Sequence, residues 1–144
     1  MKATELRIGN LIEFRHQGIF IILDFHVTGF DKDSKEEIYM VRVLTPDRKE
    51  IMLIKNVNEL IPIPLTEEWL LKYGFELRDK VNGGYVKQIN FPHQKEYLYC
   101  SKKGIVALWS DPQNREFGIM NDCEYVHQLQ NLYFALTGNE LEIK

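Results

Sequence analysis

Short apolar segments separated by turn signals recur through the first 64 residues of the chain. Segments of this length, spaced roughly 8–12 residues apart, are typical of small β-units in which each strand pairs with a neighbour. The predicted strands are Leu11–Phe14, Ile19–Phe25, Ile38–Leu44, Ile51–Ile54 and Ile61–Pro64. The pattern predicts either a strongly bent five-stranded barrel of the SH3 type or a plain antiparallel meander.

Pro62 and Pro64 mark the end of this region. Two prolines remove two backbone donors, so this segment cannot lie in a central strand and is expected to be an edge strand or a linker. The preceding segment 28–37 is polar and charged, which predicts a mobile loop. We therefore expect one unit over residues 1–64 and a second over residues 65–144.

The second unit is predicted to begin with a short helix. Thr66 is a suitable N-cap, Glu67 and Glu68 favour the first helical turn, and Gly74 is placed to end the helix. Antiparallel strands follow, starting at residue 75. The whole chain is therefore predicted to be α+β and mostly antiparallel β.

The C-terminal helix has the clearest helical pattern in the chain. Asn121 and Glu124 resemble a capping box, and Gly138 is placed to end the helix. The apolar positions follow the helical period and are Val126, Leu129, Tyr133 and Leu136. Beyond it, Leu141 and Ile143 alternate with glutamates and predict a half-buried strand.

Polar side chains occupy another side of this helix: His127, Gln128, Gln130 and Asn131. They either satisfy buried backbone groups at a helix–sheet junction or form a recognition surface. Phe134 falls off the apolar stripe, so it covers a second sheet surface or contacts a partner. These five residues are the candidate interaction surface.

The charge of the chain does not favour a nucleic-acid backbone as partner. The net charge is −3, and the two parts carry 9 basic against 10 acidic residues and 9 against 11. A phosphate-binding surface normally has a basic excess. The longest strongly apolar run, Ile19–Leu23, is far below the ~20 residues that span a bilayer. We therefore expect no membrane association.

Two cysteines, Cys100 and Cys123, are too few for a disulfide scaffold, and the N-terminus lacks the apolar core of a signal peptide. This predicts a cytoplasmic protein with free thiols. With His127 they supply at most three zinc ligands where a structural site needs four, and Cys123 with His127 is a weak nucleophilic pair. We predict no metal and no cofactor.

One further acid–base pair is conceivable, because Asp24 and His26 alternate on one side of a strand. Their closeness to the charged loop predicts exposure instead. The sequence places no second carboxylate to complete a glycosidase-like pair. It therefore assigns no catalytic residues.

Three segments resemble a group of uncharacterised small proteins from Bacteroides-like bacteria, many of them in prophages and mobile elements. The segments are Glu5–Asn10, Pro62–Glu76 and Val126–Gly138, which together cover about a quarter of the chain. The resemblance implies a bacterial cytoplasmic protein and carries over no activity or site.

From these features we expect a non-enzymatic binding or accessory module of a phage or mobile element, with a protein as partner. The alternative is a nucleic-acid-associated protein that uses the first β-unit, since small β-barrels often bind nucleic acid. An enzyme of unrecognised type is the third hypothesis. A basic groove favours the second, and a polar cavity with a shifted pKa favours the third.

Overall fold

The computed structural model describes residues 5–31, 36–45, 49–79, 83–90, 95–111 and 116–144. The chain divides into two compact units, Met1–Ile63 and Pro64–Lys144. Each unit contains one five-stranded antiparallel sheet, and the second unit also contains two α-helices. The predicted α+β class, mostly antiparallel β with a C-terminal helix, is confirmed.

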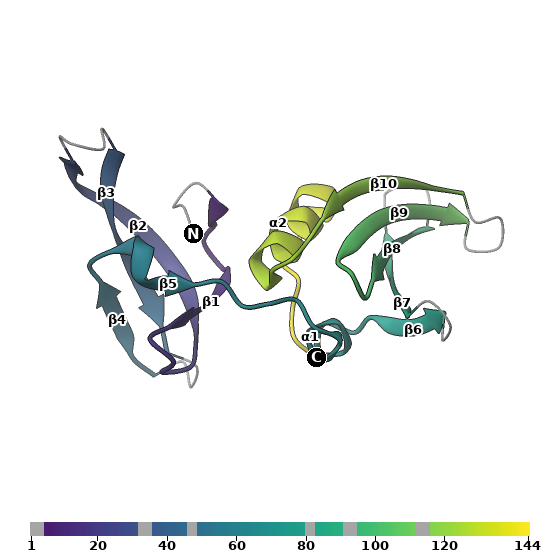
Figure 1. Ribbon diagram of the computed structural model, residues 1–144, viewed down its shortest axis with the longest axis horizontal. Coiled ribbons are helices and arrows are strands. Elements are labelled where there is room, and N and C mark those ends of the chain that lie inside the picture. The colour runs from purple at the N-terminus through teal and green to yellow at the C-terminus, as the bar shows by residue number, and fades with distance from the viewer. Residues whose placement is uncertain (1–4, 32–35, 46–48, 80–82, 91–94, 112–115) are drawn as a thin grey trace. The chain divides into compact units, whose positions relative to one another are not determined.

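Unit 1 is a single sheet with the strand order β4-β3-β2-β1-β5 (Figure 1). Its elements are β1 (Leu11–Phe14), β2 (Ile19–Asp31), β3 (Glu36–Leu44), β4 (Ile51–Ile54), the 3₁₀ turn η2 (Val57–Glu59) and β5 (Leu60–Ile61). The first four strands form a meander, and β5 returns to pair with β1. This return gives the strand order of an SH3-type barrel, and β4 and β5 are the two edges of the sheet.

The core of unit 1 comes from the alternation of side chains along these strands. Val41 and Val43 of β3 are buried and stand opposite Ile54 and Met52 of β4. Successive side chains in a strand point to opposite faces, so Arg42 and its partner Leu53 lie on the outer face. Residues from every strand and from η2 join the same cluster: Ile12, Phe14, Phe20, Ile22, Val57 and Leu60.

The predicted loop over residues 28–37 is wrong at both ends. Strand β2 continues to Asp31 and β3 begins at Glu36, and these two strands pair from Ile21 opposite Leu44 to Asp31 opposite Glu36. Two register shifts interrupt the ladder, one between Ile22 and Asp24 and one between Val27 and Gly29. Backbone pairing therefore overrides the polar composition of the segment; residues 32–35 lie outside the described residues.

Unit 2 contains a second sheet with the order β10-β9-β8-β7-β6, whose strands curve strongly (Figure 1). Its elements are α1 (Glu67–Lys72), β6 (Glu76–Asp79), β7 (Gly84–Asn90), β8 (Lys95–Ser101), β9 (Ile105–Asp111), β10 (Glu116–Asp122) and α2 (Val126–Thr137). Each strand pairs with the next along the chain. Strand β6 is one edge of this sheet.

Helix α1 begins after Thr66, as predicted, but the Thr66 side chain makes no capping hydrogen bond. The helix is held by one buried face instead, because Trp69, Leu70 and Tyr73 recur at helical spacing and all three are buried. Gly74 follows with φ of 74°, a left-handed conformation that glycine adopts at low cost.

The start of α2 differs from the prediction. Asn121 belongs to β10, and the N-cap position is Tyr125. The capping group is the Gln128 side chain, whose Oε1 accepts hydrogen bonds from the backbone N–H groups of Glu124 (2.8 Å) and Tyr125 (3.1 Å). Glu124 therefore does not act as the capping acid. Gly138, with φ of 70°, ends the helix as predicted.

The strand predicted at the C-terminal end does not form. A strand would place Leu141 and Ile143 on the same face, but Leu141 is buried and Ile143 is exposed, and the backbone is irregular. The Lys144 N–H donates instead to the Lys72 carbonyl at the end of α1 (2.9 Å). The C-terminal backbone is therefore bound to the end of helix α1 and not to a neighbouring strand.

Candidate functional site

The five residues predicted as an interaction surface on α2 have different environments. His127 and Gln130 are buried, and the His127 ring stacks on Tyr125 with the ring centroids 5.8 Å apart. Gln128 is half-buried and caps the helix, which is the structural role considered for it. Asn131 is half-buried, and Phe134 is 39% exposed. Phe134 is thus the most exposed of the five residues, and an interaction surface on α2 stays a prediction.

The two cysteines are buried and free. Burial, with the charge of the neighbouring Cys123, raises the pKa of Cys100 to about 12. Burial and the charge of Asp122 raise the pKa of Cys123 to about 11. Both thiols therefore stay protonated at neutral pH, where a thiolate would be the reactive form. Among the described residues no group of three His, Cys, Asp or Glu side chains is placed to hold a metal ion.

Asp24 and His26 do form a pair, with His26 Nε2 3.1 Å from Asp24 Oδ1. A third member, Arg42 of β3, donates from Nε to both Asp24 oxygens at 2.9 and 2.8 Å. Hydrogen bonding from Arg42 is the main cause that holds the pKa of Asp24 below its usual value. The carboxylate therefore stays ionised, and both its oxygens accept hydrogen bonds from the Arg42 guanidinium. This makes it a poor general base.

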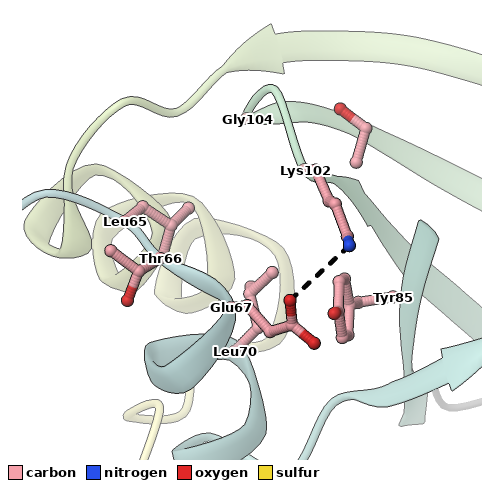
Figure 2. Close-up of a pocket in the computed structure, with 8 residues that line it drawn as sticks. Leu65, Thr66, Glu67, Leu70, Tyr85, Lys102 and Gly104 are labelled. Carbon is pink, nitrogen blue, oxygen red and sulfur yellow. Dashed lines mark ion pairs between the residues drawn. The ribbon is translucent and has the colours of Figure 1, made fainter. Parts of the chain in front are cut away.

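Unit 2 contains a pocket of about 220 Å³ between α1, β7 and the turn that joins β8 to β9. Figure 2 shows the side chains that line it, with the Glu67 carboxylate facing both the Lys102 ammonium and the Tyr85 ring. Leu65 and Leu70 supply apolar wall, and the remaining lining residues are Thr66, Ser101 and Gly104. The pocket thus combines one anion, one cation and one phenol with an apolar surface.

The charged groups of this pocket are only loosely paired. Lys102 Nζ lies 3.6 Å from Glu67 Oε2, and both side chains are more than half exposed. The Tyr85 hydroxyl first, and the Lys102 charge after it, hold the pKa of Glu67 below its usual value. The same interaction with Glu67, together with burial, raises the pKa of Tyr85 to about 12. The approach of the hydroxyl to Glu67 falls short of a well-aligned hydrogen bond, although this hydroxyl is buried.

Backbone geometry places the Lys102 backbone at the mouth of the pocket. The aliphatic part of Lys102 lies where a Cβ on Gly83 would stand, and the Lys102 N–H donates to the Gly83 carbonyl at 3.2 Å. At Gly104, φ is 82° and a Cβ would clash with the Cys123 carbonyl oxygen. Both turns therefore require glycine, and together they position Lys102 at the mouth of the pocket.

Unit 1 carries a different candidate site, the outer side of edge strand β4. Ile51 is 61% exposed and Leu53 is 47% exposed. They alternate along the strand and share its outer face with Leu44 and Arg42, their partners on β3. In the described part of the chain β4 pairs with β3 on one side and forms the edge of the sheet on the other.

Neither site was predicted from the sequence. The strand Ile51–Ile54 was predicted, but four apolar residues in a row do not reveal which face is exposed or that the strand lies at an edge. Glu67 was predicted only to favour the first turn of a helix, and Lys102 was not among the candidate site residues. Thirty-five positions separate them, so only the fold of unit 2 brings them together.

Within the described residues, α1 and α2 are both too short to span a bilayer as apolar helices. Comparisons of the chain with protein-family models, with curated proteins and with solved structures yield no match. The two sites are therefore interpreted from their own geometry.

Proposed function

We propose that this protein is a non-enzymatic binding module whose unit 1 binds an extended segment of a partner protein along β4. The observation that carries the proposal is the exposure of Ile51 and Leu53 on an edge strand. An edge strand presents a row of backbone donors and acceptors, and a peptide can pair with that row as an additional strand.

The sequence of β4 favours such pairing. Natural sheets protect their edges with proline, with charged side chains or with bulges. Strand β4 reads Ile-Met-Leu-Ile and contains neither a proline nor a charge. Its ladder with β3 runs without a register shift over all four residues. The strand has four residues, so a binding segment of about four to six residues would cover it.

The exposed side chains indicate the chemistry of the partner. A strand added to β4 places alternate side chains beside Ile51 and Leu53, so these positions are expected to be apolar. Lys55 follows the strand directly and is exposed. An acidic residue at the matching end of the partner segment would complement its charge.

The ionisable groups of the protein support binding over catalysis. The thiols of Cys100 and Cys123 have raised pKa values, and Asp24 is held as an anion by Arg42. A general base or nucleophile at neutral pH needs a pKa near the working pH or a lowered one. The raised thiol pKa values disfavour a nucleophile, and the lowered carboxyl pKa moves Asp24 away from the neutral range that suits a general base.

Two arginines of unit 1 are paired with carboxylates, which favours a protein partner over nucleic acid. Arg42 is bound to Asp24, and Arg15 forms an ion pair with Glu59. Phosphate contacts made by Lys and Arg supply most non-specific nucleic-acid affinity. Guanidinium groups already neutralised by carboxylates contribute less to such contacts. A bacterial mobile-element origin remains a prediction from sequence resemblance.

The test is selection of peptides from a random displayed library on the full-length protein, followed by affinity measurement with fluorescence polarisation. Selected peptides are expected to contain alternating apolar residues. Leu53→Lys should weaken binding at least tenfold, since it removes apolar contact and places a charge on the edge. Leu77→Lys on β6 is the matched control and should leave the affinity unchanged.

Two results would overturn the proposal. Equal affinity of the selected peptides for the wild type and for Leu53→Lys would place the binding site elsewhere. A dimer in sedimentation experiments that dissociates in Leu53→Lys would mean that a second copy of this chain occupies β4.

A further inference from the structure

We propose that the pocket of unit 2 binds a small zwitterion with an apolar side group, of the class of a free aliphatic α-amino acid. The pocket belongs to a different unit from β4 and stands independently of the function proposed above. Its rim carries one carboxylate, Glu67, and one ammonium, Lys102, with the buried Tyr85 hydroxyl beside them (Figure 2).

The spacing of the charged pair shows that it can be opened. A hydrogen-bonded ammonium–carboxylate pair has an N···O distance of about 2.7–2.9 Å. Glu67 and Lys102 are 3.6 Å apart and half exposed, whereas the neighbouring pair Glu68–Lys72 closes to 2.7 Å. An exposed pair of this kind contributes little to stability. A ligand that offers each group a closer partner can therefore separate Glu67 from Lys102 with little loss of stability.

The buried hydroxyl of Tyr85 is the second observation. Tyr85 is fully buried and lines the pocket, yet its hydroxyl lacks a well-formed hydrogen bond. Buried polar groups in native proteins nearly always have a partner, from the protein or from a bound molecule. Its position beside Glu67 and Lys102 makes it an additional donor for a ligand carboxylate.

Charge balance selects the zwitterion. An anion alone would leave two negative charges facing one ammonium, and a cation alone would leave two positive charges facing Glu67. A zwitterion adds no net charge: its carboxylate accepts from Lys102 and Tyr85, and its ammonium donates to Glu67. Leu65 and Leu70 offer apolar surface to its side group.

The volume sets an upper limit on the ligand. Pockets for drug-sized molecules occupy roughly 300–1,000 Å³, and one water in the liquid takes about 30 Å³. A pocket of about 220 Å³ therefore suits a single amino acid better than a nucleotide or a cofactor.

The experiment is a titration of the full-length protein with L-leucine, N-acetyl-leucine and leucine amide, followed by ¹⁵N NMR and calorimetry. Leucine is expected to shift the amide signals of Glu67, Tyr85 and Lys102. N-acetyl-leucine lacks the ammonium and leucine amide lacks the carboxylate, so each should bind roughly ten- to a hundredfold more weakly, the factor expected for one charged hydrogen bond.

Variants assign the groups. Glu67→Gln and Lys102→Met should each weaken leucine binding roughly tenfold or more, and Tyr85→Phe by a few-fold, as for a neutral hydrogen bond. Glu68→Gln, in the adjacent ion pair on α1, is the matched control and should leave the affinity unchanged. Circular dichroism of each variant verifies folding.

Three outcomes would overturn the inference. Equal binding of leucine and N-acetyl-leucine would make the pocket an anion site, and equal binding of leucine and leucine amide would make it a cation site. If none of the three ligands shifts these signals at millimolar concentration, the pocket does not bind amino acids.

Discussion

Two four-residue edge strands, β4 in unit 1 and β6 in unit 2, have opposite surface chemistry. Strand β4 reads Ile-Met-Leu-Ile, whereas β6 reads Glu-Leu-Arg-Asp. Both expose a leucine, Leu53 at 47% and Leu77 at 43%, but charged residues flank only Leu77 within its strand. Charged side chains oppose the addition of another strand. An exposed leucine alone therefore does not identify a binding edge. The charge of its neighbours in the strand determines whether another strand can pair there.

The units also differ in how they build their cores. Unit 1 forms its buried cluster from strands and the turn η2. Unit 2 adds buried side chains from both helices, such as Trp69 and Leu70 of α1 and Val126 and Leu129 of α2. Truncating a buried apolar side chain of a helix should therefore destabilise unit 2 directly, because its helices contribute to its core.

The largest expected effect is that of Leu129→Ala. Leu129 is fully buried, and truncation of a buried leucine costs about 2–5 kcal/mol through lost transfer energy and the cavity that remains. Both tryptophans, Trp69 and Trp109, belong to unit 2, so tryptophan fluorescence during urea unfolding follows this unit. A loss below about 0.5 kcal/mol would show that α2 is not part of the core of unit 2.

Gln130→Ala is expected to have the next largest effect. Gln130 is only 3% exposed, and a buried group that loses its partner costs about 1–3 kcal/mol. The same urea titration measures it. Asn131→Ala, at the half-buried neighbouring position, should change stability less than Gln130→Ala does. The reverse order would assign the surface role to Gln130 and the structural role to Asn131.

A substitution in the turn between β1 and β2 is expected to stabilise unit 1. Arg15 and His16 have φ of 46° and 59°, and the Gln17 N–H donates to the Phe14 carbonyl at 2.9 Å. Unit 2 uses glycine at its positive-φ turns, for example Gly104. A left-handed conformation costs a non-glycine residue roughly 1–2 kcal/mol, and glycine loses about 0.5–1 kcal/mol of that gain through chain entropy. His16→Gly should thus stabilise unit 1 by about 0.5–1 kcal/mol.

Hydrogen exchange of the amides of β1 and β2 would measure this gain, because unit 1 contains no tryptophan. The matched change in unit 2, Gly104→Ala, should destabilise, since a Cβ there clashes with the Cys123 carbonyl oxygen. Slower exchange in Gly104→Ala would contradict this description of the turns.

Leu53→Lys and Leu77→Lys test the two edge strands directly. Both leucines are exposed, so each change should alter the free energy of unfolding by about 0.5 kcal/mol or less. Peptide binding separates them, because only Leu53→Lys should lose it. Comparable losses of binding in both variants would mean that the charges in β6 do not protect that edge.

The smallest effect is the pH dependence that Asp24 contributes. Its pKa in the folded protein is lowered, chiefly by hydrogen bonding from Arg42. The folded state then favours the ionised form, so the stabilisation is complete above the unfolded pKa of about 3.9 and is lost as the pH falls through the lower folded pKa. NMR titration of the carboxyl carbon should show Asp24 titrating below that value. In Arg42→Ala the titration should move upward, and an unchanged midpoint would exclude Arg42 as the cause.

Sequence patterns were most successful where one segment determines its own structure. Local residue patterns predicted the positions of strands β1 to β4, the start of α1 after Thr66 and the end of α2 at Gly138. These patterns failed where the structure of a segment depends on a partner that is distant in the sequence. The polar segment after Val27 is a strand because β3 pairs with it, and α2 is capped by Gln128 because β10 extends to Asp122.

The sequence by itself determined the α+β class, because the spacing of apolar residues sets which face of a helix or strand can be buried. The tertiary structure alone decided which strands lie at the edges and which charges meet. Ile51–Ile54 is an edge only because β5 pairs with β1 and not with β4. Glu67 faces Lys102 only because α1 and the turn after β8 converge in unit 2. Such meetings depend on chain topology, which local residue patterns do not encode.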